Sequence, residues 1–170
     1  MDVRGPRAEL PQFSVADDER WMDDALTEAR AALKHDDVPV GAVVVRDGAV
    51  IGRAHNSREA DQDPTAHAEI LALRDASAAL GRWRLDDCAL YVTVEPCAMC
   101  AGAAVLARIP LVVFGAPEPR TGAVLSVAQL LDEPALNHHP KWRMGVRRAD
   151  AERLLIDFFE LRRAERSPAD

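Results

Sequence analysis

The sequence predicts one α/β domain with a three-layer α/β/α architecture, in which helices cover both faces of a mixed β-sheet. One helical segment is followed by two apolar segments around a turn, which indicates a β-hairpin, and helical and strand-like segments then alternate. A hairpin contributes antiparallel strands and helix–strand alternation contributes parallel ones, so the sheet is mixed. The chain has 170 residues, 48% of them hydrophobic and 29% charged, which suits one domain with a sizeable core.

The first expected elements are a helix and a hairpin. Over 17–33, apolar side chains recur three and four positions apart, which is the spacing of one helix face. The apolar segments 40–45 and 50–54 flank the turn sequence Arg46-Asp47-Gly48, so we expect them to pair as antiparallel strands.

Prolines mark the starts of the next two helices. Pro64 precedes a helical pattern over 66–80, and Pro96 opens a helix that carries 99–106. Between them, 89–94 is a short apolar strand.

The rest of the domain follows the same alternation. A third apolar strand is expected over 111–114 and a helix over 125–131, while 137–145 is predicted to be loop. An amphipathic helix over 149–163 closes the domain.

Composition places the chain among cytoplasmic proteins with one folded domain. Residues 1–16 are expected to be a flexible segment, 17–165 the folded domain and 166–170 a tail. No apolar run approaches the roughly 20 residues that span a bilayer, so we expect no membrane contact. The cysteines are Cys88, Cys97 and Cys100, and an odd number with a C-x-x-C pair favours metal binding in a reducing compartment over disulfides.

Net charge alone argues against binding nucleic acid, because it is -7 at pH 7. The charge is uneven, however. Residues 1–30 hold eight acidic and four basic side chains, whereas 141–170 hold eight basic and six acidic ones. A solvated surface explains this bias more simply than a binding site does.

Three side chains have the chemistry of a metal site. His67, Cys97 and Cys100 offer one imidazole and two thiolates, a set that suits tetrahedral Zn²⁺, one per chain, with the fourth position left for water. A structural zinc site would need a fourth protein ligand, and the spare Cys88 is expected to point into the core. An open position indicates a catalytic zinc instead.

Local sequence brings these ligands to two helix starts. Cys97 and Cys100 are three positions apart and can share one side of a helical turn, where exposed backbone N–H groups favour thiolates. His67 is expected at the entry to its helix, with the longer Glu69 side chain curling back toward it. Zinc lowers the pKa of bound water from about 15.7 to near 7, so the hydroxide can attack a ring carbon that bears an amine. Glu69 would carry the protons.

The spacing His67-Ala-Glu69 followed by Pro96-Cys97-Ala-Met-Cys100 is the signature of the zinc-dependent nucleobase deaminases. Further segments resemble the bacterial tRNA adenosine deaminase (TadA) family over about residues 17–165. They are VPVGA (38–42), DPTAHAE (63–69), LYVTVEPCAMCAG (90–102), RI (108–109), VFGA (113–116), TG (121–122) and DFFELRR (157–163). This resemblance implies a homodimer of the cytidine-deaminase-like fold that converts adenosine to inosine at the wobble position of a tRNA anticodon stem-loop.

The resemblance also implies roles for residues outside the zinc signature. Asn56 would hydrogen-bond the flipped nucleoside, and Val40 and Ala66 would form walls of the adenine pocket. Without the resemblance, Asn56 reads equally well as a turn residue, and the other two as ordinary core.

The resemblance implies that a loop and the last helix contact the nucleotides on either side of the reacting adenosine. Glu118 and Arg120 match the loop, although the family often has an aspartate where this chain has Glu118, between two prolines. Arg162 matches a family helix near the RNA, together with Phe158 and Phe159. Helical spacing alone predicts a solvated Arg162 and two core phenylalanines, and for Phe159 we expect the core.

Rival functions remain open at the level of sequence. A guanine or cytosine aminohydrolase acting on free bases would use identical zinc chemistry. A catalytically silent RNA-binding partner subunit belongs to another class, and Glu69 argues against it because such a subunit needs no proton carrier. A structural zinc module is the weakest alternative.

Overall fold

The computed structural model describes residues 13–166, so 1–12 and 167–170, which belong to the expected terminal segments, lie outside the described residues. The elements are α1 (Asp18–Ala32), β1 (Gly41–Arg46), β2 (Ala49–His55), α2 (Arg58–Asp61), α3 (Ala68–Leu80), β3 (Ala89–Val94), α4 (Ala98–Leu106), β4 (Leu111–Ala116), β5 (Lys141–Met144) and α5 (Arg148–Arg166). Short 3-10 turns lie at Val15–Asp17, Leu33–His35 and Leu130–Asp132.

The strands form the mixed sheet that the sequence predicts. Their order is β2-β1-β3-β4-β5, with β1 antiparallel to both of its neighbours and β3, β4 and β5 parallel to one another. The tight turn between β1 and β2 has positive φ angles of 49° at Asp47 and 72° at Gly48, which suits a two-residue hairpin.

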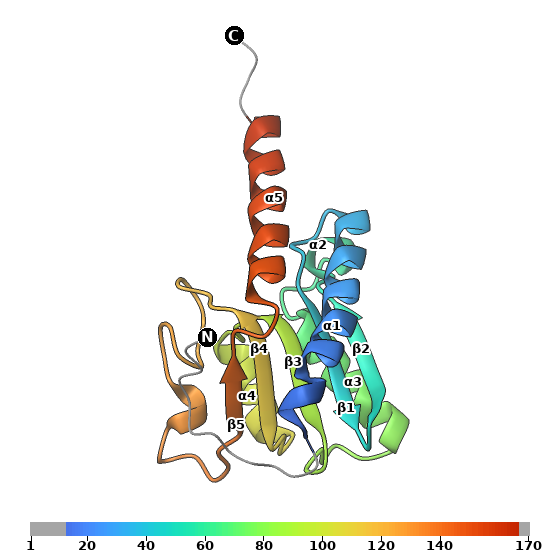
Figure 1. Cartoon of the computed structure of the whole chain (residues 1–170), viewed down its shortest axis with the longest axis vertical. Coiled ribbons are helices and arrows are strands. Elements are labelled where there is room, and N and C mark those ends of the chain that lie inside the picture. Colours follow the sequence, from blue (N-terminus) through green and yellow to red (C-terminus); the bar gives the residue numbers. More distant parts are fainter. Residues whose placement is uncertain (1–12, 167–170) are drawn as a thin grey trace.

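Alternate strand residues point to opposite faces of the sheet. Both faces carry apolar side chains, and helices cover each of them. Val43 and Val45 of β1 pack with α1, whereas Ala42 and Val44 pack in the core under α3 and α4. Ala151 of α5 packs on the same face of the sheet as α1. Figure 1 shows α5 continuing well past the end of the sheet.

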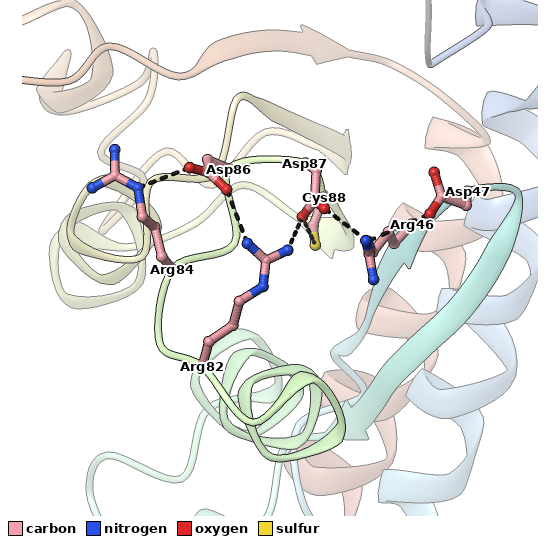
Figure 2. Close-up of polar contacts among 7 residues, drawn as sticks. All are labelled: Arg46, Asp47, Arg82, Arg84, Asp86, Asp87 and Cys88. Carbon is pink, nitrogen blue, oxygen red and sulfur yellow. Dashed lines mark hydrogen bonds and ion pairs between the residues drawn. The ribbon is translucent and has the colours of Figure 1, made fainter.

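An ion-pair network closes one end of the sheet (Figure 2). Arg46, the last residue of β1, pairs with Asp87, and Arg82 in the loop after α3 bridges Asp87 and Asp86. The buried Cys88 thiol donates to the Asp87 carboxylate at 3.3 Å. The network therefore ties the hairpin to the start of β3, at the sheet end opposite to the C-terminal end of β3.

Spacing predicts a helix over 125–131, but this prediction is wrong: only Leu130–Asp132 forms a helical turn. The backbone amides of residues 124–126 donate to the Glu95 carboxylate instead. This contact between distant parts of the chain holds the segment in turns.

The predicted loop over 137–145 contains a strand, β5, and α2 is a further element that the sequence analysis missed. β5 has four residues, two of them charged, and pairs with β4 at the sheet edge. From this edge Arg143 binds the buried Asp18 of α1 at 2.9 Å. Its guanidinium also donates to the Phe13 carbonyl at 3.0 Å, so the packed chain begins before residue 17.

Among residues 13–166, no helix is both long and apolar enough to cross a membrane.

Candidate metal centre

The structure brings His67, Cys97 and Cys100 together at the C-terminal end of β3. Within the described part of the chain these three form a cluster whose potential ligand atoms all lie within 4.8 Å of one another. His67 Nδ1 is 3.7 Å from Cys97 Sγ and 3.5 Å from Cys100 Sγ. The imidazole therefore presents Nδ1, not Nε2, to both sulfurs.

Helix starts produce this convergence. His67 is the residue before α3 and Cys97 the residue before α4, and both have extended backbones with ψ angles of 147° and 175°. The expected entry position of His67 agrees with this, although α3 begins at Ala68 and not at residue 66. Two helix N-termini thus meet at one point, and the positive end of each helix dipole favours anionic ligands there.

The donor set and its spacing fit zinc. With zinc–sulfur distances of about 2.3 Å and zinc–nitrogen distances of about 2.0–2.1 Å at tetrahedral angles, neighbouring sulfur and nitrogen ligands lie about 3.5 Å apart. The two sulfur–nitrogen distances, 3.7 and 3.5 Å, match this value. Two thiolates with one imidazole are also the ligands that zinc prefers.

Protons are shared among the three side chains. A hydrogen bond with Cys100, with help from His67, lowers the pKa of the Cys97 thiol to about 3. The same bond, together with burial, raises the pKa of Cys100, and contact with Cys97 raises the pKa of His67. These contacts favour the thiolate at Cys97, the form that binds metal.

Glu69 lies beside this cluster without being part of it. Its side chain is only 4% exposed, and burial raises its pKa to about 7. The neighbouring Cys97 and Cys100 are among the groups that shift this pKa, so the carboxyl lies close to the metal ligands. A carboxyl with such a pKa can both accept and donate a proton at neutral pH.

The residues expected in the substrate pocket adjoin His67. Asn56 Oδ1 accepts from the Ala68 amide at 3.1 Å and so caps α3. The backbone amide of Asn56 donates to the Val40 carbonyl, and the backbone amide of Ser57 donates to the Ala66 carbonyl, both at 3.0 Å. Val40, Asn56 and Ala66 therefore lie around the start of α3.

The segment 117–126 follows β4 and packs on the start of α4. Gly122 forms a β-bridge with Cys97, and the Ala123 amide donates to the Pro96 carbonyl at 2.8 Å. Within this segment Glu118 Oε1 accepts from the Arg120 amide at 2.9 Å, and Arg120 is exposed. The two residues expected near flanking nucleotides thus share a loop that touches a candidate metal ligand.

Arg162 lies farther from the cluster, on α5. Its guanidinium donates to the Asp36 carbonyl at 2.8 Å and lies 5.4 Å from the Phe158 ring centroid. Phe158 is buried as expected, but Phe159 is 46% exposed, so its expected place in the core is wrong. Two adjacent residues of a helix point in different directions, and here Phe158 is the one that faces the core.

Two buried carboxylates, Asp37 and Glu95, make contacts that the sequence pattern does not predict. Asp37, 1% exposed, accepts from the backbone amides of Glu59 and Ala60 at the start of α2. Glu95, 3% exposed, accepts from several amides of the segment 117–126. Nothing in the local spacing of either residue signals these contacts, because their partners are distant in sequence.

Comparison with known proteins identifies the family. The model of the MafB19-like deaminase family matches residues 16–159. A protein of Bacillus subtilis called tRNA-specific adenosine deaminase is 45% identical over 154 residues, which cover 90% of this chain and 96% of that protein. The chain belongs to the tRNA-specific adenosine deaminase family.

Solved structures agree with this family membership. A structure from studies of A-to-I editing by tRNA:A34 deaminases at the wobble position of transfer RNA has a TM-score of 0.78 and 44% identity, covering 80% of this chain and 99% of that one. This likeness confirms the expected cytidine-deaminase-like fold. A guanine deaminase from Nitrosomonas europaea shares the fold at 26% identity and a TM-score of 0.72, covering 82% of this chain and 83% of that one.

Proposed function

We propose that this member of the tRNA-specific adenosine deaminase family converts adenosine to inosine at the wobble position of a tRNA anticodon, using one zinc ion per chain. The observation that carries the proposal is the cluster of His67, Cys97 and Cys100 beside the buried Glu69, in a chain so similar to a protein called tRNA-specific adenosine deaminase. We assign the activity to a single domain that includes the expected range 17–165 and the packed residues from Phe13 onward.

His67 Nδ1 and the sulfurs of Cys97 and Cys100 would hold the zinc, as their spacing supports. When bound there, zinc supplies Lewis acidity that brings the pKa of a water ligand from about 15.7 to near 7. The N-terminus of α4 favours the thiolate form of Cys97, the residue that precedes this helix.

Glu69 would move the protons of the hydrolysis. Its carboxylate takes a proton from the attacking water and passes it to the purine ring nitrogen beside the reacting carbon. The water oxygen bonds to that carbon, the bond to the amine breaks, and Glu69 transfers the second water proton to the departing nitrogen, which leaves as ammonia. A pKa of about 7 suits a group that must act as base and then as acid.

Substrate selection would depend on the residues around the start of α3 and on residues of segment 117–126 and α5. Val40 and Ala66 would enclose the base, and Asn56, whose Oδ1 is occupied by the Ala68 amide, would offer its amide N–H groups to the nucleoside. Glu118, Arg120 and Arg162 would meet the flanking nucleotides, the two arginines contacting phosphates.

We further infer a cytoplasmic homodimer. The three cysteines are free, which suits a reducing compartment. An apolar groove between α3 and α4 is lined by residues that include Trp83 and Leu106, which are 62% and 74% exposed. The family resemblance makes a second copy the expected occupant of this face.

A comparison of substrates tests the proposed function. We expect an anticodon stem-loop with adenosine at the wobble position to be deaminated far faster than free adenosine or guanine, because a loop base is already unpaired and its neighbours add binding energy. Ammonia release from each substrate at equal concentration measures this. Efficient release from guanine, with none from the stem-loop, would instead support the free-base aminohydrolase.

A further inference from the structure

The segment 117–126 is held by a single buried side chain, Glu95, which follows β3 directly. Glu95 Oε1 accepts from the backbone amides of Val124, Leu125 and Ser126 at 3.2, 2.7 and 2.8 Å. Its Oε2 accepts from the Glu118 amide at 2.9 Å and from the Ser126 hydroxyl. One carboxylate therefore fixes both ends of the segment.

Gly122, in the middle of the segment, is packed on the same carboxylate. A methyl group at this position would overlap Glu95 Oε2 and would lie 2.6 Å from the Glu118 carbonyl oxygen. Such close approach leaves room only for glycine. The carboxylate is thus in contact with the start, the middle and the end of the segment.

The segment is also joined to the candidate metal centre. Gly122 is bridged to Cys97, and Ala123 is bonded to Pro96. Glu95 itself lies in the same short stretch as Pro96 and Cys97. A rigid connection therefore runs from the metal ligand through Glu95 to the exposed Arg120.

We propose that Glu95 is a positioning residue that holds segment 117–126 so that Arg120 meets the RNA backbone beside the reacting nucleotide; this rests on the proposed function. Glu95 takes no part in the chemistry. It acts through the loop, and preorganising the loop removes the ordering cost that RNA binding would otherwise carry.

Glu95→Gln tests this with little change in shape. A glutamine has one oxygen and one NH₂ group. If the oxygen keeps the amides of 124–126, the NH₂ group faces the Glu118 N–H and that anchor is lost; if the amide is turned round, the other three are lost. Gly122→Ala disturbs the same carboxylate from the loop side. Val127→Ala is the matched control, because Val127 is 61% exposed and borders the segment.

Stem-loop affinity is measured in a Glu69→Ala background, which prevents turnover, and hydrogen exchange is followed at the amides of residues 118 and 124–126. We expect Glu95→Gln and Gly122→Ala to bind zinc normally, to exchange these amides faster and to bind the stem-loop about tenfold more weakly. The slope of log affinity against log salt should flatten by about one unit, as for one lost phosphate contact. With Glu69 present, KM should rise about tenfold with kcat within about threefold.

Unchanged affinity and salt slope in the two variants would overturn the proposal, even if exchange becomes faster. Should Glu95→Gln fail to fold, the same readings on Gly122→Ala decide. Weakened binding by Val127→Ala equal to that of the other two would also overturn it, since any change near the loop would then suffice. If the unaltered protein forms no inosine, the proposed function is wrong. The role of Glu95 in holding the segment is still tested in that case, because hydrogen exchange at the anchored amides is measured without RNA.

Discussion

At the residue scale, the candidate site separates metal binding from proton transfer. His67, Cys97 and Cys100 approach one another closely, while the Glu69 carboxyl is buried beside them and is not one of the three. Removing one function should therefore leave the other measurable, and single substitutions make this separation testable.

Glu69→Ala should keep its zinc and lose most of its turnover. Loss of a general acid–base group alone costs about 10²–10⁴-fold in rate, and a group used at several steps should reach the upper part of that range. Zinc content and inosine formation are measured on the same preparation. Glu59→Ala, an exposed glutamate on α2, is the control and should retain full activity. A zinc-loaded Glu69→Ala protein with near-normal turnover would refute the proton-transfer role.

Cys97→Ala should lose tightly bound zinc, whereas Cys88→Ala should retain about one ion per chain, the stoichiometry of a single site. Cys88 is buried in the network at the other end of the sheet, and burial raises the pKa of its thiol to about 12. It therefore offers no thiolate. Metal analysis after dialysis separates the variants. Equal zinc in both would contradict the assigned ligand set.

At the element scale, one buried ion pair joins the sheet edge to the first helix. The side chains of Arg143 in β5 and Asp18 in α1 are 11% and 3% exposed, and Asp18 also accepts from the Tyr91 hydroxyl of β3 at 2.9 Å. Burial raises the pKa of Asp18, while the bonds from Tyr91 and Arg143 oppose the rise.

Arg143→Met should destabilise the fold in a pH-dependent way. Without the guanidinium, the pKa of Asp18 rises further above its unfolded value. The protonated carboxyl is then favoured in the folded state, so stability is highest below about pH 3.8, the ordinary Asp pKa, and is lost as pH rises through the folded pKa. We expect a loss of about 3–5 kcal/mol at pH 7 and a smaller loss at pH 4.5.

Urea unfolding at the two pH values measures this difference. The double variant Asp18→Asn, Arg143→Met should show no such pH dependence, because the titrating group is gone. A loss of stability that is equal at both pH values in Arg143→Met would show that Asp18 does not depend on the arginine.

The sequence predicts elements well where their own residues decide the structure. The strand 89–94 and the helix starts at His67 and Cys97 follow from local patterns, so the metal cluster could be anticipated. The strand β5 is not predictable from its own residues because it is short and charged. Its position depends on pairing with β4 and on the bond from Arg143 to Asp18. The helix predicted over 125–131 is wrong because the backbone amides of 124–126 donate to Glu95, which is distant in sequence.

At the scale of the whole molecule, the apolar groove between α3 and α4 leads to a prediction about assembly. Trp83 and Leu106 expose large apolar surfaces there, which favours contact with another chain. We expect a dimer in sedimentation experiments at micromolar concentration and a monomer for Trp83→Glu. Phe159→Glu is the control, because Phe159 is an exposed aromatic residue on α5. Trp21→Glu cannot serve, because Trp21 is buried. A monomeric unaltered protein would contradict the homodimer.

Charge over the whole molecule also frames the interaction with RNA. With a net charge of -7, attraction to a polyanion has to be local, and exposed arginines on α5 and in segment 117–126 are among those that could supply it. Arg162 is partly used within the protein, since it pairs with Asp36 at 3.7 Å. Arg120 has its backbone amide fixed by Glu118 and its side chain exposed, which makes it the better candidate for a phosphate contact.

The most direct test of the central claim is to sequence a tRNA with adenosine at the wobble position after incubation with the purified protein. Zinc-loaded protein should convert that adenosine to inosine, read as guanosine, and leave other adenosines unchanged. Protein stripped of metal by a chelator should form none until zinc is restored. Inosine at many positions, or equal conversion by stripped protein, would contradict the account.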